Sequence, residues 1–330
     1  MSSADGLERE QKQAGKAGGI LPERKEAARR KQARRDKEEM ICTLCPRRCG
    51  AERTEAQGSG YCRQPSLPVV ARAGLHLWEE PVISGTRGAG TVFFSGCSLG
   101  CVFCQNEAIS QKDFGKIVSV ERLADIFREL EARGAHNIDL VSPTHFAHIL
   151  PAAIEKSGVG IPFVWNSGGY DTMETVRAMA PYIQVWLPDL KYLSPDRAGR
   201  YSDAPDYPAV ATAAIAEMVA QAGPCVMEGG LLKRGVLIRH LLLPGALAEA
   251  KAVMDWVAET FPAGSVLFSL MGQYLPLGRA KDFPEIDRAL RPSELKSAVA
   301  YMDALGLQGF TQDAAAADEA YIPAFDLTGV

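Results

Sequence analysis

Three cysteines lie within eight residues of the stretch "FFSGCSLGCVFCQN". Cys97, Cys101 and Cys104 follow an apolar run with the spacing C-x3-C-x2-C. A closed zinc site would require a fourth thiolate or imidazole, and none follows nearby. A four-iron cluster held by three thiolates instead leaves one iron with an open coordination position for a substrate or cofactor. The motif therefore predicts a chemically active [4Fe-4S] centre. A zinc site completed by a distant histidine, or unligated buried thiols, are the alternatives.

A second group of cysteines precedes the first. Cys42, Cys45, Cys49 and Cys62 have the pattern C-x2-C-P-x2-C-x12-C, and four thiolates make a closed site for zinc or for an iron–sulfur cluster. We expect residues 40–88 to be a short metal-binding segment and its lead-in, with the metal contributing much of its folding energy. Structural zinc is slightly favoured, because nothing in the spacing demands iron. Disulfides are disfavoured in a reducing compartment.

The composition is that of an ordinary globular chain. Its 330 residues are 47% hydrophobic and 23% charged, and 36 basic against 40 acidic residues give a formal charge of −4. No global basic field therefore argues for a nucleic-acid or membrane partner. No apolar stretch approaches the roughly 20 residues of a transmembrane helix, and no secretory leader is recognisable. We expect a cytoplasmic protein, with residues 1–39 a highly charged, disordered or solvated tail.

Residues 89–330 alternate short apolar runs with amphipathic segments. The runs are apolar on both faces, as parallel strands covered on both sides should be. Six β-α repeats predict an α/β fold, a partial (β/α)6 TIM-like barrel with functional residues at the carboxyl ends of its strands. The expected strands are 91–96, 137–142, 162–167, 182–190, 236–244 and 266–274.

Two helix starts can be predicted between these strands. Ser119 is a suitable N-cap for a helix that ends near Gly134, with an apolar face that includes Phe127. Asp171, followed three residues later by Glu174, predicts a capping box at the start of another helix.

The motif "CSLGCVFC", including the aromatic Phe103 before the third cysteine, resembles the signature of radical S-adenosylmethionine (SAM) enzymes. Further segments resemble the PflX-type family, whose members are usually described as pyruvate formate-lyase activating enzyme-like proteins. These segments are "CTLCPRRCG", "GYCR", "LHLWEEPVISGTRGAGTVFFSGC", "PDLKY", "SLMGQY" and "YIPAFDLTGV". The resemblance extends over about residues 41–330.

The resemblance implies an oxidoreductase with two cofactors, a [4Fe-4S] cluster and SAM. In such enzymes the open iron binds the methionine end of SAM. An electron from the reduced cluster then cleaves SAM to a 5′-deoxyadenosyl radical, which abstracts hydrogen from a substrate. The resemblance also implies a reductant such as flavodoxin or ferredoxin as a partner.

Polar residues at the other strand ends are candidates for cofactor binding. Asp189 and Lys191 match an Asp-x-Lys motif of glycyl-radical activases, and Arg239 matches an activase arginine; the alternatives are an exposed turn pair and a stabilising ion pair. "SPTH", beginning at Ser142, replaces the Gly-Gly-Glu segment that commonly receives the amino group of SAM, and Asn166 offers a polar group. The further candidates are Phe103, Asn106 and Gln273.

The resemblance to activases points to a substrate. We expect hydrogen abstraction from a glycine of a partner glycyl-radical enzyme, through the lateral opening of a barrel that lacks two strands. Radical modification of another peptide, of RNA or of a metabolite is the alternative within the same chemistry. A non-catalytic metal-binding interaction module is the alternative of a different class.

Overall fold

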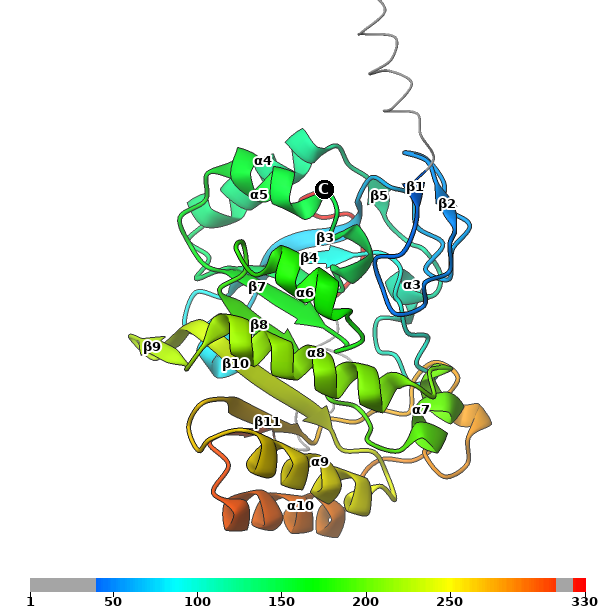
Figure 1. Ribbon diagram of the computed structural model, residues 1–330, viewed down its shortest axis with the longest axis vertical. Helices are drawn as coiled ribbons and strands as arrows, with labels where there is room; N and C mark the ends of the chain where they lie inside the picture. The colour runs from blue at the N-terminus through cyan, green and yellow to red at the C-terminus, as the bar shows by residue number, and fades with distance from the viewer. Residues whose placement is uncertain (1–39, 313–322) are drawn as a thin grey trace, which may run out of the picture. The chain divides into compact units, whose positions relative to one another are not determined.

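The computed structural model describes residues 40–312 and 323–330 (Figure 1). The predictions for the charged segment 1–39, and the residues Tyr321 and Ile322 of the last motif, lie outside the described residues. Residues Ile41–Val330 form one compact unit. Within the described residues, no helix is long and apolar enough to cross a membrane.

A ten-stranded, mostly parallel sheet forms the centre of this unit (Figure 1). All six predicted strands are present, and each pairs in parallel with the next in the order β4-β6-β7-β8-β10-β11. The sheet does not close on itself, which confirms an α/β fold of the partial-barrel type. The strands are β4 (Ala89–Phe94), β6 (Ile138–Val141), β7 (Phe163–Ser167), β8 (Val185–Pro188), β10 (Leu231–Leu241) and β11 (Leu267–Met271).

Additional strands extend the sheet beyond the six repeats. β3 (Val69–His76) pairs antiparallel with β4 and carries the short β5 (Lys116–Ile117), while β12 (Gly309–Gln312) pairs in parallel with β11. β9 (Val226–Glu228) forms a hairpin with β10. The remaining two strands, β1 (Met40–Ile41) and β2 (Glu52–Arg53), form a separate small sheet.

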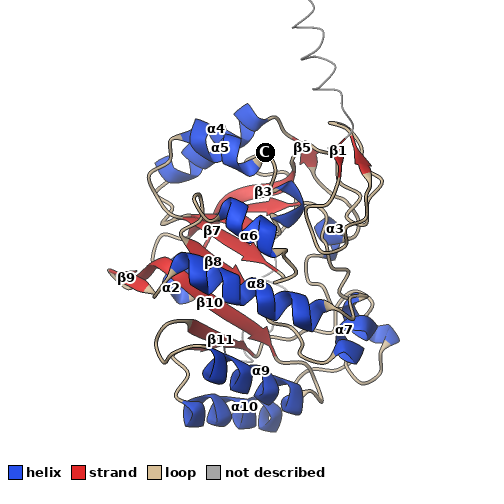
Figure 2. Ribbon diagram, viewed as in Figure 1, coloured by secondary structure: helices blue, strands red, loops and turns tan. Residues whose placement is uncertain are grey.

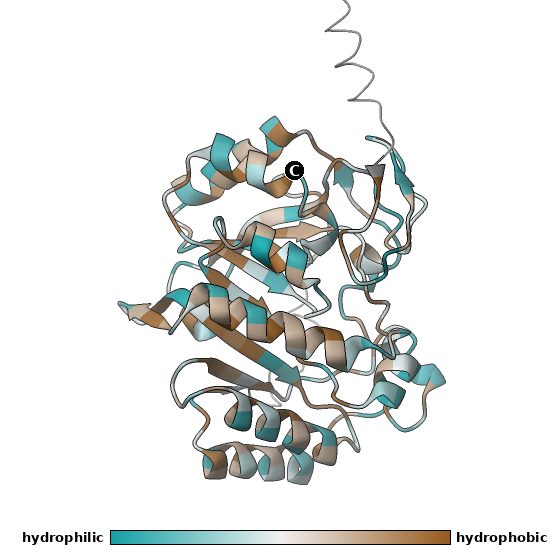
Figure 3. Cartoon of the chain, in the orientation of Figure 1, coloured by the Kyte–Doolittle hydropathy of each residue, from teal (hydrophilic) through white to brown (hydrophobic). Residues whose placement is uncertain are grey.

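Helices cover the outer face of the sheet (Figure 2). Their sheet-facing side chains and the strands bury a continuous core that includes Trp165 and Trp186. Figure 3 shows brown apolar strands inside and teal polar positions on the helices. The longer helices are α4 (Val120–Ala132), α5 (Leu150–Ser157), α6 (Met173–Met179), α7 (Pro195–Ser202), α8 (Tyr207–Ala222), α9 (Leu247–Thr260) and α10 (Pro292–Leu305), and the short ones are α2 (Pro81–Ser84), α3 (Glu107–Ser110), η1 (Thr144–Phe146) and η2 (Ala280–Asp282).

The two predicted helix starts have different outcomes. The Ser119 side chain caps α4 by accepting a hydrogen bond from the Arg122 amide, as predicted. The capping box at Asp171 is wrong, because Thr172 is the N-cap of α6 and accepts from the amide of Thr175. The carboxylate of Asp171 is buried instead and accepts hydrogen bonds from hydroxyl groups at the ends of β6 and β7. Tertiary contacts thus take the side chain away from the helix terminus.

Candidate functional site

A cavity of about 650 Å³ lies at the carboxyl ends of the parallel strands. All eleven residues predicted for the cluster and the cofactor line it, although they come from widely separated parts of the chain. Ligands of open α/β sheets bind at the carboxyl ends of the strands, because the loops that follow the strands meet there. The eleven residues are Cys97, Cys101, Phe103, Cys104, Asn106, Ser142, Asn166, Asp189, Lys191, Arg239 and Gln273.

The loop that carries three cysteines begins directly after β4. Each sulfur atom has a hydrogen-bond partner: the Leu99 amide donates to Cys97 Sγ at 3.3 Å, and Ser110 Oγ donates to Cys104 Sγ at 3.2 Å. Cys101 Sγ lies 2.9 Å from the hydroxyl oxygen of a serine on α7. Hydrogen bonds to the ligating sulfurs are one of the means by which proteins set the reduction potential of an iron–sulfur cluster.

The electrostatics of the three-cysteine loop are those of thiols that lose their protons when they bind metal. Burial, followed by the charges of the neighbouring thiols Cys101 and Cys104, raises the pKa of Cys97 to about 12. The free Cys97 thiol is therefore protonated at neutral pH, and metal binding would release its proton. Within the described part of the chain, neither this cysteine group nor the one at residues 42–62 has three side chains already arranged around a single metal ion. By its donor set, a loop with three thiols fits a [4Fe-4S] cluster that keeps one iron open.

A network of charged side chains forms the opposite wall of the cavity. The Asp189 carboxylate accepts from Lys191 Nζ at 2.6 Å and from Arg239 Nε at 2.8 Å. Arg239 also donates from Nη2 to Asn166 Oδ1 at 2.7 Å. Burial opposes ionisation of Asp189, but the charges of Arg239 and Lys191 outweigh it and lower its pKa. All four predicted residues thus meet, and Asp189 connects the two cations.

Glu79 is a member of this network that the sequence analysis did not single out. Its Oε1 accepts from Arg239 Nη1 at 2.9 Å, and its Oε2 accepts from Asn166 Nδ2 at 3.1 Å. The Arg239 guanidinium thus has Glu79, Asp189 and Asn166 as partners within the protein. These contacts are those of a stabilising ion pair, the alternative to cofactor binding that the sequence left open for Arg239. Arg239 uses three of its five N–H donors in these contacts and Lys191 uses one of its three, so Lys191 keeps the larger share of its donors for a ligand. The sequence signal that could have identified Glu79 is the pair of consecutive acids in the largely apolar segment "HLWEEPVIS".

Two buried carboxyl groups lie behind this wall. Burial, followed by the nearby charge of Glu79, raises the pKa of Glu80 to about 7 and raises that of Asp139 strongly. Glu80 accepts hydrogen bonds from Ser269 Oγ and from the side-chain amide of Gln312. These contacts connect the β3–α2 loop to strands β11 and β12 across the open side of the sheet. Glu80 thus helps to hold the two sides of the sheet in place, while Asp139 accepts from Thr91 and Asn166 on the strands next to its own.

The remaining predicted residues surround the cysteines. Phe103 packs edge-on against Tyr274, with 5.9 Å between the ring centroids, and Asn106 precedes α3. Ser142 has a φ of +59°, an unusual backbone conformation that often marks functional sites. The buried Oε1 of Gln273 has no hydrogen-bond partner among the described residues, so a ligand in the cavity could supply one.

The four-cysteine segment gathers its thiols in one place. Cys42, Cys45 and Cys62 are buried and Cys49 is exposed. Burial raises the pKa of Cys45 to about 12, and the other three thiols contribute to the shift. The thiols are thus close enough to repel one another as thiolates, and a metal would be needed to hold them ionised. Its identity stays a prediction.

A buried guanidinium supports an anionic group at this segment. Arg53 is 2% exposed, and no carboxylate contacts it within the described residues. It donates to backbone carbonyls, including that of His145 at 2.6 Å, and lies 3.6 Å from Cys42 Sγ. A buried cation is costly unless a counter-charge is nearby. Thiolates bound to a metal would supply that charge, so the segment fits a metal centre.

Comparisons with known proteins agree with the cysteine loop. Residues 91–226 match the family model of the Radical SAM superfamily. The match thus extends over about two fifths of the chain. The matched residues begin in β4 and end at β9, so they include the three-cysteine loop, Asp189 and Lys191.

One curated relative and two solved structures are similar over larger parts of the chain. An uncharacterized protein of Methanocaldococcus jannaschii is 28% identical over 270 residues, which are 78% of this chain and 73% of the relative. A domain of pyruvate-formate lyase-activating enzyme from Bacteroides vulgatus is 15% identical, with a TM-score of 0.35 over 59% of this chain and 91% of that one. Methylornithine synthase is 14% identical, with a TM-score of 0.45 over 67% and 70%.

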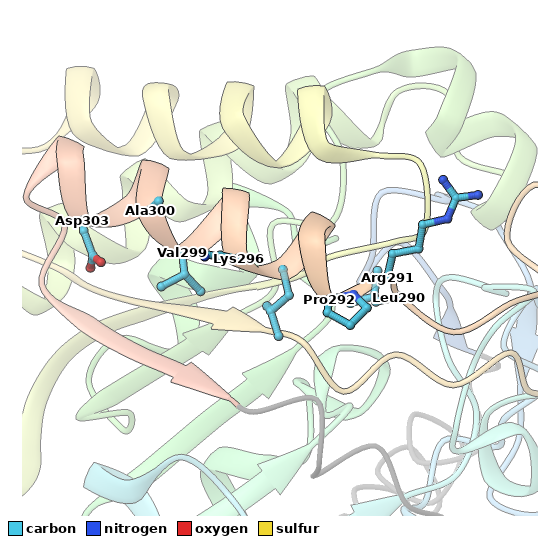
Figure 4. Close-up of a pocket in the computed structure, with 8 residues that line it drawn as sticks. Leu290, Arg291, Pro292, Lys296, Val299, Ala300 and Asp303 are labelled. Atoms are coloured by element: carbon cyan, nitrogen blue, oxygen red, sulfur yellow. The ribbon is translucent and has the colours of Figure 1, made fainter.

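A second cavity, of about 620 Å³, lies along α10 (Figure 4). Its walls come from this helix and the turn before it, and they contain no cysteine or histidine. Of these two cavities, the one at the strand ends is therefore the one that brings reactive groups together. The lining residues along α10 are Leu290, Arg291, Pro292, Leu295, Lys296, Val299, Ala300 and Asp303.

Proposed function

We propose that the protein is a radical SAM enzyme that abstracts hydrogen from a protein substrate, with the Cα of a glycine in a partner glycyl-radical enzyme as the first candidate. One observation supports the general reaction above all others. Cys97, Cys101 and Cys104 line a cavity together with Lys191, and among the described residues no fourth cysteine lines it. A [4Fe-4S] cluster with bound SAM supplies reductive cleavage to a 5′-deoxyadenosyl radical and hydrogen abstraction.

The residues of the cavity have separate tasks in this proposal. The three thiols hold the cluster with one iron open, and the backbone and hydroxyl donors around them stabilise their charge. Lys191, held by Asp189, is placed to pair with the carboxylate of SAM. Asn106, Ser142 and Gln273 offer further polar contacts, and Phe103 packs beside the third cysteine. The four thiols of residues 42–62 hold zinc or a second cluster.

The open sheet supports a large substrate. The cavity is lined from both edges of the sheet, by His76 at the end of β3 and by Gln312 at the end of β12. These edges do not pair with each other, and the contacts of Glu80 with Ser269 and Gln312 bridge part of the gap, so a segment of extended peptide would enter beside Glu80. A PflX-type activase acting in the cytoplasm, reduced by flavodoxin or ferredoxin, is the specific form of the proposal that follows from the sequence motifs.

Two measurements test the proposal. The reconstituted protein, with dithionite and SAM, should yield 5′-deoxyadenosine, and the matched variant Cys104→Ala should yield none. Mixed with the glycyl-radical enzymes of the same cell, it should produce the electron paramagnetic resonance doublet of a glycyl radical. If SAM is cleaved while every such enzyme stays radical-free, the activase proposal is wrong, and another peptide, RNA or a metabolite is the substrate. A colourless zinc protein without SAM cleavage would favour a non-catalytic metal-binding module.

A further inference from the structure

One guanidinium joins the four-cysteine segment to the loop that carries the other three cysteines. Arg47, between Cys45 and Cys49 in the chain, donates from Nε to the carbonyl of Ser98 at 2.8 Å. It also donates from Nη2 to the carbonyl of Ser202 at 3.1 Å, and from Nη1 to that of Asp203 at 2.5 Å. All three acceptors are backbone carbonyls, so Arg47 fixes the path of the chain on both sides.

These acceptors lie on two sides of Cys101. Ser98 precedes it in the loop, and the hydroxyl oxygen of Ser202 lies 2.9 Å from Cys101 Sγ. The same hydroxyl is 3.0 Å from the Tyr192 hydroxyl, so its orientation is defined. The amide after Cys101 also donates to the carbonyl of the residue before Ser202, at 2.9 Å. A displacement of Arg47 would therefore remove one support from each of the two segments that contact Cys101, the loop at Ser98 and the end of α7 at Ser202.

Close packing reinforces this connection. The Arg47 guanidinium lies 3.9 Å from the centroid of the Tyr61 ring. A Cβ atom at Gly100 would lie 2.8 Å from the Tyr61 hydroxyl oxygen, and one at Gly96 would lie 2.9 Å from the carbonyl oxygen of Cys62. Gly96, with a φ of +81° and the backbone of Cys62 beside it, thus requires glycine, and a side chain at Gly100 would displace Tyr61, because the four-cysteine segment lies directly against the loop.

We infer that the four-cysteine segment positions the radical SAM loop, with Arg47 as the positioning residue, so that metal binding at the first site controls the geometry of the second. The Arg47 side chain is 14% exposed, whereas its neighbour Arg48 is exposed. A guanidinium presents several donors in a fixed plane and can bind three carbonyls at once, which an ammonium cannot do in the same geometry. Metal binding at the four-cysteine site would fold this segment and thereby position the Arg47 guanidinium. This inference rests on the proposed metal sites and requires no particular substrate.

The test compares Arg47→Ala and Arg47→Lys with the matched control Arg48→Ala in the full, reconstituted chain. Hydrogen exchange reports the loop backbone, and electron paramagnetic resonance with redox titration reports the reduced cluster. We expect amides 98–102 to exchange at least about tenfold faster in both Arg47 variants, as loss of these backbone contacts permits local opening. Arg47→Ala should also make the cluster harder to reduce, because a nearby cation favours the more negative reduced state. Arg48→Ala should leave both readouts unchanged.

Cys49→Ser tests the metal-dependent part, because this exposed residue can be changed with little disturbance of the core. It should lower the metal content of the first site and cause the same faster exchange in residues 98–102. Unchanged exchange and an unchanged spectrum in Arg47→Ala would overturn the positioning role. Loss of the metal from the four-cysteine site without any change in the loop would overturn the control by metal.

If Arg47→Ala does not fold, the exchange of amides 98–102 in Arg47→Lys, which keeps the charge and the approximate length of the side chain, tests the positioning role instead. Because exchange is measured without turnover, these results are independent of SAM cleavage and substrate identity.

Discussion

Asp189 is the connection between the two cations of the cavity wall, so its charge can be removed selectively. Asp189→Asn keeps the shape of the side chain and one acceptor oxygen but leaves Lys191 without its carboxylate at 2.6 Å. Arg239 loses its contact at 2.8 Å and keeps Glu79 at 2.9 Å. The change thus leaves two buried cations with one direct carboxylate partner.

The expected cost follows from the burial of this network. The side chains of Asp189, Lys191 and Arg239 are only 12–17% exposed, so water screens them weakly. Removal of one partner of a buried pair costs roughly 3–5 kcal/mol. Because Arg239 keeps Glu79, we expect the lower end, about 3 kcal/mol in the free energy of unfolding. The pKa of Asp189 is lowered, so its carboxylate is ionised and the full effect is present at pH 7.

Urea unfolding at pH 7 under anaerobic conditions would measure the loss. Asp303→Asn is the matched control, because Asp303 is exposed on α10 and should show no measurable change. A midpoint for Asp189→Asn that equals those of the control and the wild type would refute the reasoning, since it would mean that Asp189 does not hold the cations together. Lys191→Met in the Asp189→Asn background should then cost less than it does alone, because the two residues are coupled.

Three further predictions concern the cysteines and a buried histidine. Alanine at Cys97, Cys101 or Cys104 should abolish SAM cleavage, since two thiolates cannot hold the cluster with one iron open; full cleavage, measured as 5′-deoxyadenosine, would contradict the assignment. Cys62→Ala should chiefly lower folding yield and metal content, seen by purification and elemental analysis, and normal yield with full metal would exclude a structural role. Burial lowers the pKa of His145 from 6.5 to about 3, so the unfolded chain binds a proton first and stability falls as pH falls from about 6.5 toward 3. The loss from this group should be roughly 2 kcal/mol at pH 5, and urea unfolding of His145→Gln should show a shallower pH dependence than the wild type.

The central sheet could be predicted because its pattern is local. Strands buried on both faces, such as β7 with its five buried residues, produce apolar runs that are readable from neighbouring positions alone. The N-cap Ser119 was predictable for the same reason. Thr172 was missed in favour of Asp171 because the choice depends on hydrogen bonds to Ser167 and Thr144, which arrive from other strands. β3 was missed because it precedes the first β-α repeat, and β12 was missed because its four residues, GFTQ, form no apolar run.

The candidate site divides in a similar way. The three-cysteine spacing identified a cluster loop, since ligands within eight residues can meet without help from the rest of the fold. Residues at strand ends could be proposed because parallel strands bring their carboxyl ends to one edge. Neither the partners of Arg239 nor the role of Glu79 could be read from the sequence, because their contacts join residues separated by up to 160 positions.

The sequence by itself determined the chemistry that the chain can perform, since thiol spacing and strand periodicity are set by neighbouring residues. Only the tertiary structure decided which charges face the ligand. Lys191 has one contact with a carboxylate and keeps two donors for the cavity, while Arg239 gives three of its five donors to Glu79, Asp189 and Asn166. It also decided that the two cysteine groups lie together, through Arg47 and the carbonyl of Ser98, 51 residues away. The physical reason is that buried charges and backbone carbonyls take their partners from whatever the fold brings within hydrogen-bond reach, and no local pattern encodes that proximity.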